Sequence, residues 1–84
     1  MKFLASIDIM PHKELLDPQG KTVSKNMDNV DIHGIEDVRI GKHIELKLEA
    51  ENASAAEEKV EMACKKILAN VIMEKYTYTI SELN

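Results

Sequence analysis

The clearest strand pattern in the sequence is Asp37-Val-Arg-Ile-Gly-Lys-His-Ile-Glu-Leu-Lys-Leu-Glu49. Side chains of an extended chain point alternately to opposite faces, so this alternation of apolar and polar residues predicts β structure with one buried face. Gly41 interrupts the alternation, as glycine does at turns and bulges. A two-residue loop there would mix apolar and polar residues on one face, so we expect an odd loop or a bulge. One bent, continuous strand would place the same residues on the same face, so the sequence leaves this alternative open. The apolar positions are Val38, Ile40, Ile44, Leu46 and Leu48.

Two further strands are predicted outside this stretch. The first covers residues 2–10 and ends at Pro11, which has no N–H to donate to a strand ladder. The last covers about residues 73–80 and leaves residues 81–84 as a loose tail. One face of the first strand carries Phe3, Ala5, Ile7 and Ile9, and one face of the last carries Tyr76, Tyr78 and Ile80.

Two helices are predicted between the strands. The first opens on Asp17 and Pro18, because Asp is a favoured N-cap and proline has its φ already set for the first helical position. It is expected to end near Val30. The second opens on the capping box Ser54–Glu57 and runs to about Ala69.

The predicted element order is β-α-β-β-α-β within a single domain, residues 1–84. Two helices separated by strands, with a hairpin in the middle, indicate an α+β two-layer sandwich. Both helices would cover one face of an antiparallel sheet. The other face would carry Leu4, Met10 and the pair Tyr76 and Tyr78, and such a half-apolar, uncovered face is a candidate subunit interface.

The composition predicts that the chain associates with other chains. It has 84 residues, of which 44% are hydrophobic and 4% aromatic. An aliphatic core of this size supplies only about 3–5 kcal/mol without further cross-links. The single cysteine cannot form an internal disulfide, and no Cys/His cluster in the sequence could hold a structural metal. Association with other subunits is the remaining route to stability.

Charge and hydropathy exclude two kinds of partner. The formal net charge is −4, whereas nucleic-acid-binding proteins usually carry a basic surface. No apolar run approaches the ~20 residues that span a bilayer, and the N-terminus lacks the apolar stretch of a signal peptide. A lone, buried cysteine fits a reducing compartment, so we expect a cytoplasmic protein without nucleic-acid or membrane partners.

The sequence contains no recognisable catalytic motif. The three histidines lie on different segments without metal-ligand spacing, and no phosphate-binding loop or nucleophile motif is present. Considered alone, Arg39 would pair with Glu45 across strands and Lys42 would be a solvated turn residue. We therefore expect no catalytic residue, metal or cofactor on this chain, since no nucleophile, base and orienting group come together.

Two motifs carry a resemblance to a known family. The segment Leu16-Asp-Pro-Gln-Gly-Lys21, followed by Asp37-Val-Arg-Ile-Gly-Lys42, resembles the PurS family. Its members are the small subunits of the multi-chain form of phosphoribosylformylglycinamidine synthase. The resemblance covers nearly the whole chain, although Val71 stands where such chains commonly carry proline.

The resemblance implies a non-catalytic role in an ATP-dependent amidoligase of de novo purine biosynthesis. In this family a glutaminase subunit releases ammonia from glutamine, and a large synthetase subunit uses ATP and Mg²⁺ to convert formylglycinamide ribonucleotide to the amidine. The small subunit self-associates, to a dimer or a tetramer, and is thought to bridge the other two. The residues carried over as partner or oligomer contacts are Asp17, Pro18, Gln19, Gly20, Arg39, Gly41 and Lys42.

Three other functions fit parts of the pattern. An ACT-like dimeric domain has the same element order and would bind a small molecule between subunits, with Gly20 and Gly41 lining the site. An acylphosphatase-like enzyme would need an anion-binding loop before a helix, and no glycine-rich segment occupies that position. A structural protein without a metabolic role would be distinguished only by its partners.

Overall fold

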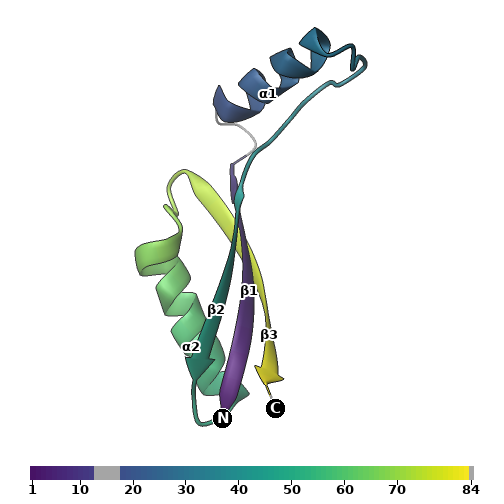
Figure 1. Ribbon diagram of the computed structural model, residues 1–84. Helices are drawn as coiled ribbons and strands as arrows, with labels where there is room; N and C mark the ends of the chain where they lie inside the picture. The colour runs from purple at the N-terminus through teal and green to yellow at the C-terminus, as the bar shows by residue number, and fades with distance from the viewer. Residues whose placement is uncertain (13–17, 84) are drawn as a thin grey trace.

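The computed structural model describes residues 1–12 and 18–83. Within them lie three strands and two α-helices, the second of which continues into a turn of π-helix (Figure 1). Asp17, the predicted N-cap of the first helix, lies outside the described residues. In chain order the elements are β1 (Lys2–Pro11), α1 (Pro18–Asn29), β2 (Lys42–Glu49), α2 (Ala53–Ala63), the π-helical turn η1 (Cys64–Leu68) and β3 (Glu74–Leu83).

β1 is the central strand of an antiparallel sheet, with β2 on one side and β3 on the other. Ile7 lies opposite Ile44 of β2 and Tyr78 of β3. This register puts the alternating apolar residues of all three strands on one face, because residues two apart along a strand point the same way. The predicted antiparallel sheet with one apolar face is confirmed.

α2 covers the apolar face of the sheet. Ala56, Val60 and Cys64 recur every four residues along the helix side that meets the strands, and all three are fully buried. Burial raises the pKa of the Cys64 thiol, so this cysteine acts as a small core hydrophobe. The α+β class and the two-layer packing of helix on sheet are confirmed. The buried strand residues are Phe3, Ala5, Ile7 and Ile9.

The predicted hairpin at Gly41 is wrong, and so is its alternative of one continuous strand. Residues 30–41 contain no strand, and β2 begins only at Lys42. β2 pairs with β1, from Lys42 opposite Ile9 to Glu49 opposite Lys2, and not with the residues before Lys42, which lead away from the sheet to α1. The element order in the described residues is therefore β-α-β-α-β.

α1 does not cover the sheet, in contrast to the prediction of two helices on one face. It stands beyond the end of the sheet, and residues 35–41 return from it to β2 in extended form (Figure 1). We call residues 18–41 the arm. The molecule measures 51 × 29 × 15 Å, with a radius of gyration of 16.6 Å. A compact domain of this length would have a radius of gyration of about 12 Å, so the arm makes the chain markedly elongated.

The structure corrects two predicted chain ends. The N-cap of α2 is Asn52, whose Oδ1 accepts a hydrogen bond of 2.8 Å from the Ala55 N–H, and not Ser54. Asn52 takes this place because its backbone is extended where the helix begins, whereas Ser54 already lies inside the helix. The tail expected from residue 81 belongs to β3, since Leu83 pairs with Lys2 of the central strand.

The tyrosine pair faces α2 and not the uncovered face of the sheet. Tyr76 and Tyr78 stack with ring centroids 6.4 Å apart, and the Tyr76 hydroxyl donates a 3.0 Å hydrogen bond to Glu61 of α2. They point this way because they lie opposite Ile9 and Ile7, both of which face the core. The uncovered face keeps Leu4 and Met10 but is otherwise mostly polar.

Candidate functional site

The base of the arm is packed tightly against the end of the central strand. Gly41 lies so close to β1 that a Cβ atom at this position would overlap the Ile9 carbonyl oxygen and the Met10 sulfur. Its φ angle is not positive, so the glycine is required by the close approach of two backbones and not by backbone conformation.

Arg39 fastens the arm to the same strand end. Its Nη2 donates hydrogen bonds to the carbonyl oxygens of Pro11, at 3.1 Å, and His12, at 2.6 Å. These carbonyls lie where the ladder with β2 has ended, and a charged, half-buried guanidinium is a strong donor for them. The expected cross-strand pair between Arg39 and Glu45 does not fit this arrangement, because Arg39 precedes β2 and is not part of the sheet.

Lys42 and Glu74, the first residues of β2 and β3, form an ion pair beside the base of the arm. The Lys42 ammonium lies 3.7 Å from the Glu74 carboxylate, which is only 22% exposed. Glu74 in turn accepts a 2.9 Å hydrogen bond from the Asn70 N–H, and the Asn70 carbonyl accepts bonds from the N–H groups of Met73 and Glu74. Lys42 is thus an ion-pair partner across the sheet and not simply a solvated turn residue.

His12 completes the connection between these segments. Its backbone N–H donates to the Met73 carbonyl at 3.0 Å, and its ring Nε2 lies 3.5 Å from the Val71 carbonyl. The end of β1, the base of the arm and the turn before β3 therefore meet at one place. We call this place the junction, and it comprises residues 9–12, 39–42 and 70–74.

The start of α1 lies beside the junction. Pro18, Gln19 and Val23 line an open groove of about 460 Å³ together with Ile40, and Gly20 is buried. The structure thus brings both sequence motifs to the base of the arm, with Asp17 outside the described residues. Their visible contacts position the arm, and their role as contacts to another chain stays a prediction.

Sequence reasoning missed three members of the junction, namely His12, Asn70 and Glu74. The only sequence signal for His12 is its place directly after the strand-ending Pro11. Asn70 lies directly after the predicted end of the second helix, and in the structure its carbonyl builds the following turn. His12 contacts residues that are far away in the chain, such as Val71, which lies 59 positions later. Local sequence patterns do not show such contacts.

A second polar cluster lies on the uncovered face of the sheet. His43 Nδ1 lies 2.7 Å from Asp8 Oδ1, and its Nε2 lies 3.8 Å from Glu45 Oε2. The hydrogen bond to Asp8 raises the pKa of His43, opposed by desolvation and helped by the charges of Asp8 and Glu45. The cluster stabilises the fold most when the imidazole is protonated.

The pKa of His43 is expected above its ordinary value of 6.5 in the wild-type chain, and closer to that value in Asp8→Asn. Because the pKa is raised by folding, the stabilisation is complete below the unfolded pKa and is lost as pH rises through the folded one. NMR titration of the His43 ring protons in both variants measures this directly. An unchanged midpoint in Asp8→Asn would show that the pair does not form in solution.

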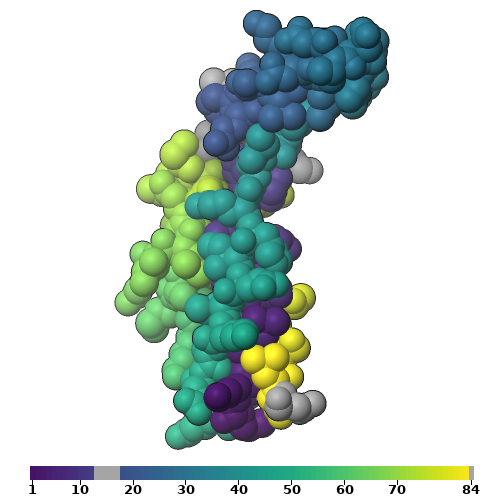
Figure 2. Space-filling view, viewed as in Figure 1, coloured from purple at the N-terminus to yellow at the C-terminus, as the bar shows by residue number. Residues whose placement is uncertain are grey.

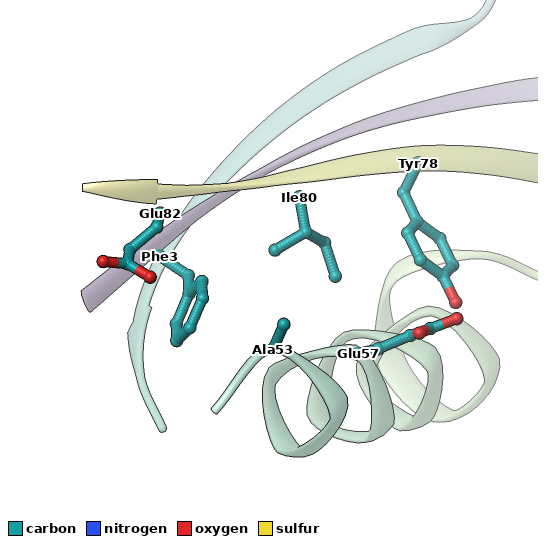
Figure 3. A pocket seen from close by; sticks show the side chains of 6 residues that line it. All are labelled: Phe3, Ala53, Glu57, Tyr78, Ile80 and Glu82. Atoms are coloured by element: carbon teal, nitrogen blue, oxygen red, sulfur yellow. The ribbon is translucent and has the colours of Figure 1, made fainter. Parts of the chain in front are cut away.

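A cavity of about 390 Å³ opens between β3 and the start of α2 (Figure 3). The Phe3 ring and Ile80 form its apolar wall, while the carboxylates of Glu57 and Glu82 lie at its two ends. Burial, followed by a hydrogen bond to Glu61, raises the pKa of Tyr78 to about 12, so this phenol is not a base near neutral pH.

The described residues show no further sign of a catalytic or metal centre. In residues 1–12 and 18–83, no group of three or more His, Cys, Asp or Glu side chains could hold a metal ion. No helix in these ranges is long and apolar enough to cross a membrane.

Comparisons with known proteins agree on one family. A family model described as PurS, phosphoribosylformylglycinamidine (FGAM) synthase, matches residues 4–82. The phosphoribosylformylglycinamidine synthase subunit PurS of Synechocystis sp. is 38% identical over 69 residues, which are 82% of this chain and 69% of that protein. PurS of Thermus thermophilus superimposes with a TM-score of 0.83, 38% identity and full coverage of both chains. A chain in the structure of PurLQS from Thermotoga maritima has a TM-score of 0.87 and 31% identity, covering 96% of this chain and 99% of that one.

Proposed function

This chain belongs to the PurS family of phosphoribosylformylglycinamidine synthase subunits, and we propose that it bridges the glutaminase and synthetase subunits of that enzyme. In this role it contributes no catalytic residue and acts in de novo purine biosynthesis by holding the other subunits together. ATP and Mg²⁺ belong to the large synthetase subunit. The buried thiol of Cys64 suits a reducing compartment, so the proposed location of the complex is the cytoplasm.

The shape of the chain is the observation that carries this proposal. α1 has 12 residues and stands away from the only sheet in the described residues. Isolated helices of 12 residues are marginal in water, because most helix stability in proteins comes from packing an apolar side. Val30, Ile32 and Ile35 on the arm are 66%, 47% and 42% exposed. The arm is therefore expected to pack against a second copy of this chain, giving the dimer or tetramer.

The junction residues fit the bridging role as positioning residues. Arg39, Gly41 and Lys42 fix the base of the arm to the sheet, while Pro18, Gln19 and Gly20 begin α1 at the same place. We propose that these residues set the direction in which the arm meets its partners. Direct contacts of Arg39 or Lys42 with acidic groups of another subunit would add to that role. We include Asp17 among these positioning residues because its motif resembles that of the PurS family.

Bridging has a chemical purpose in a glutamine-dependent ligase. Ammonia released into water is protonated and loses its nucleophilicity, so a closed path between the glutaminase and synthetase sites protects it. A subunit that holds the two sites together can close that path without catalytic groups of its own. An ACT-like sensor, the alternative considered from the sequence, is not favoured by the family match.

Leaving this chain out of the reconstituted enzyme is expected to lower glutamine-dependent synthesis at least about tenfold more than ammonium-dependent synthesis. A tenfold rate difference corresponds to about 1.4 kcal/mol in activation free energy. The reason is that free ammonium bypasses the protected path while glutamine depends on it. Steady-state rates with each nitrogen donor, with and without the chain, measure the difference. Equal losses with both donors would contradict the proposal.

A further inference from the structure

The turn before β3 displays an apolar surface that nothing in the described chain covers. Ile67 and Ile72 are 81% and 83% exposed, and Val71 and Met73 are each 51% exposed. We call these four residues the apolar turn. In Figure 2 the green and yellow-green atoms of this region stand out along one side of the molecule. Val71, Ile72 and Met73 are consecutive in the chain, and contiguous apolar residues at this level of exposure mark interaction surfaces in soluble proteins.

The apolar turn is held in one conformation by hydrogen bonds. Asn70 Oδ1 accepts from the Ile72 N–H at 3.1 Å, and the Met73 carbonyl accepts from the His12 N–H at 3.0 Å. The Ala69 N–H bonds to the Cys64 carbonyl, which closes the π-helical turn that carries Ile67. A surface already ordered before binding loses little conformational freedom when a partner arrives.

The charges beside the apolar turn indicate what kind of partner it fits. Lys65 and Lys66 directly precede Ile67 and are exposed, although Lys65 also lies 3.5 Å from Glu61. A two-fold contact between two copies of this surface would place the same patch against itself and bring these lysines together. Like charges brought together at an interface weaken it, so the surface disfavours pairing with itself and fits a partner surface with carboxylates around an apolar depression.

We propose that the apolar turn is the docking point for a different subunit of the complex, one that presents an apolar depression bordered by Asp or Glu side chains. This inference rests on the proposed function, because it names where the bridging chain meets a non-identical partner. The arm would then bind a second copy while the apolar turn binds the other subunit. The junction links the two surfaces rigidly, through His12 and Arg39.

The test is the affinity of purified variants for the separate glutaminase and synthetase subunits, measured by sedimentation. Ile72→Asp is expected to bind one of the two subunits at least about tenfold more weakly than the parent chain, while its own oligomer mass stays unchanged. Lys66→Glu is expected to weaken the same contact, and Ile72→Leu to preserve it. Ile72→Leu, which retains an apolar side chain of the same size, serves as the matched control.

Three results would overturn the inference. Normal binding of Ile72→Asp to both subunits would show that the apolar turn is not the docking point. A lower oligomer mass of Ile72→Asp on its own would show that a second copy covers this surface. Failure of the parent chain to bind either subunit would overturn the proposed function as well, which separates the two claims. Circular dichroism of Ile72→Asp and Ile72→Leu verifies that both variants fold.

Discussion

Gly41→Ala is expected to lower the free energy of unfolding by about 3 kcal/mol, most of the stability that a core of this size provides. The added Cβ would overlap the Ile9 carbonyl oxygen and the Met10 sulfur. The methionine can move aside, but the carbonyl belongs to the central strand, where Ile9 pairs with Lys42 and Tyr76 on its two sides. Relief of the overlap therefore requires displacement of the arm or loss of strand pairing.

Urea denaturation at a fixed chain concentration measures this loss, with Gly34→Ala as the matched control. Gly34 has a φ of +87° and open space around its Cβ position, so alanine there costs only about 1–2 kcal/mol from backbone strain. The loss of stability is expected to be larger at position 41 than at position 34. Equal losses at both positions, or a fully stable Gly41→Ala chain, would mean that the arm does not press against β1 as described.

The second large effect is expected for the double substitution Val30→Asp and Ile32→Asp on the arm. Both side chains are largely exposed, 66% and 47%, so the fold of a single chain does not depend on them. If positions 30 and 32 are buried between copies, two unpaired carboxylates there would weaken the free energy of association by about 3 kcal/mol. This corresponds to a roughly hundredfold lower affinity. The helical signal should fall with association, because α1 has little support from its own chain.

Analytical ultracentrifugation and circular dichroism over a range of chain concentrations measure both parts of this result. Asn26→Asp adds one carboxylate at an exposed, already polar position of α1 and is expected to leave association within about threefold of the parent chain. A double variant that keeps the oligomer mass of the parent chain would exclude the arm as the contact between copies.

Local sequence patterns predicted most of the core. Alternation along β1 predicted that Ile7 is buried, and it is fully buried. The helical spacing on the second helix predicted a buried side made of Val60, Ala63, Cys64, Ile67 and Leu68. Val60 and Cys64 are fully buried, whereas Ile67 is 81% exposed, so the prediction for Ile67 is wrong. These predictions work because one sheet face and one helix side must be shielded from water, which fixes the period of the apolar residues. The position of α1, Pro18–Asn29, was predicted by the proline at its start.

The partners of each segment could not be predicted in the same way. The alternation around Val38 and Ile40 showed which side chains share a face, but not whether a neighbouring strand extends far enough to pair with them. β1 ends at Pro11, and its pairing with β2 ends at Ile9. The segment before Lys42 touches the end of β1 but forms no ladder with it, and it positions the arm in place of a hairpin.

The candidate site was predicted in part, for a related reason. The two motifs indicated Gly20, Arg39 and Gly41, and the structure places them at the base of the arm. The interactions that define the junction also involve His12 and Glu74, which lie far from the motifs in the sequence. No local sequence pattern shows that a carbonyl at a strand end lacks a strand partner. The same holds for a carboxylate that pairs with a lysine from another strand.

Sedimentation velocity of the purified chain, alone and mixed with the glutaminase and synthetase subunits, tests most directly whether it acts through its outer surfaces. The expected result is an oligomer of the chain alone and a single larger species in the mixture that contains all three kinds of subunit. A stable monomer in dilute solution that joins neither subunit would contradict the account.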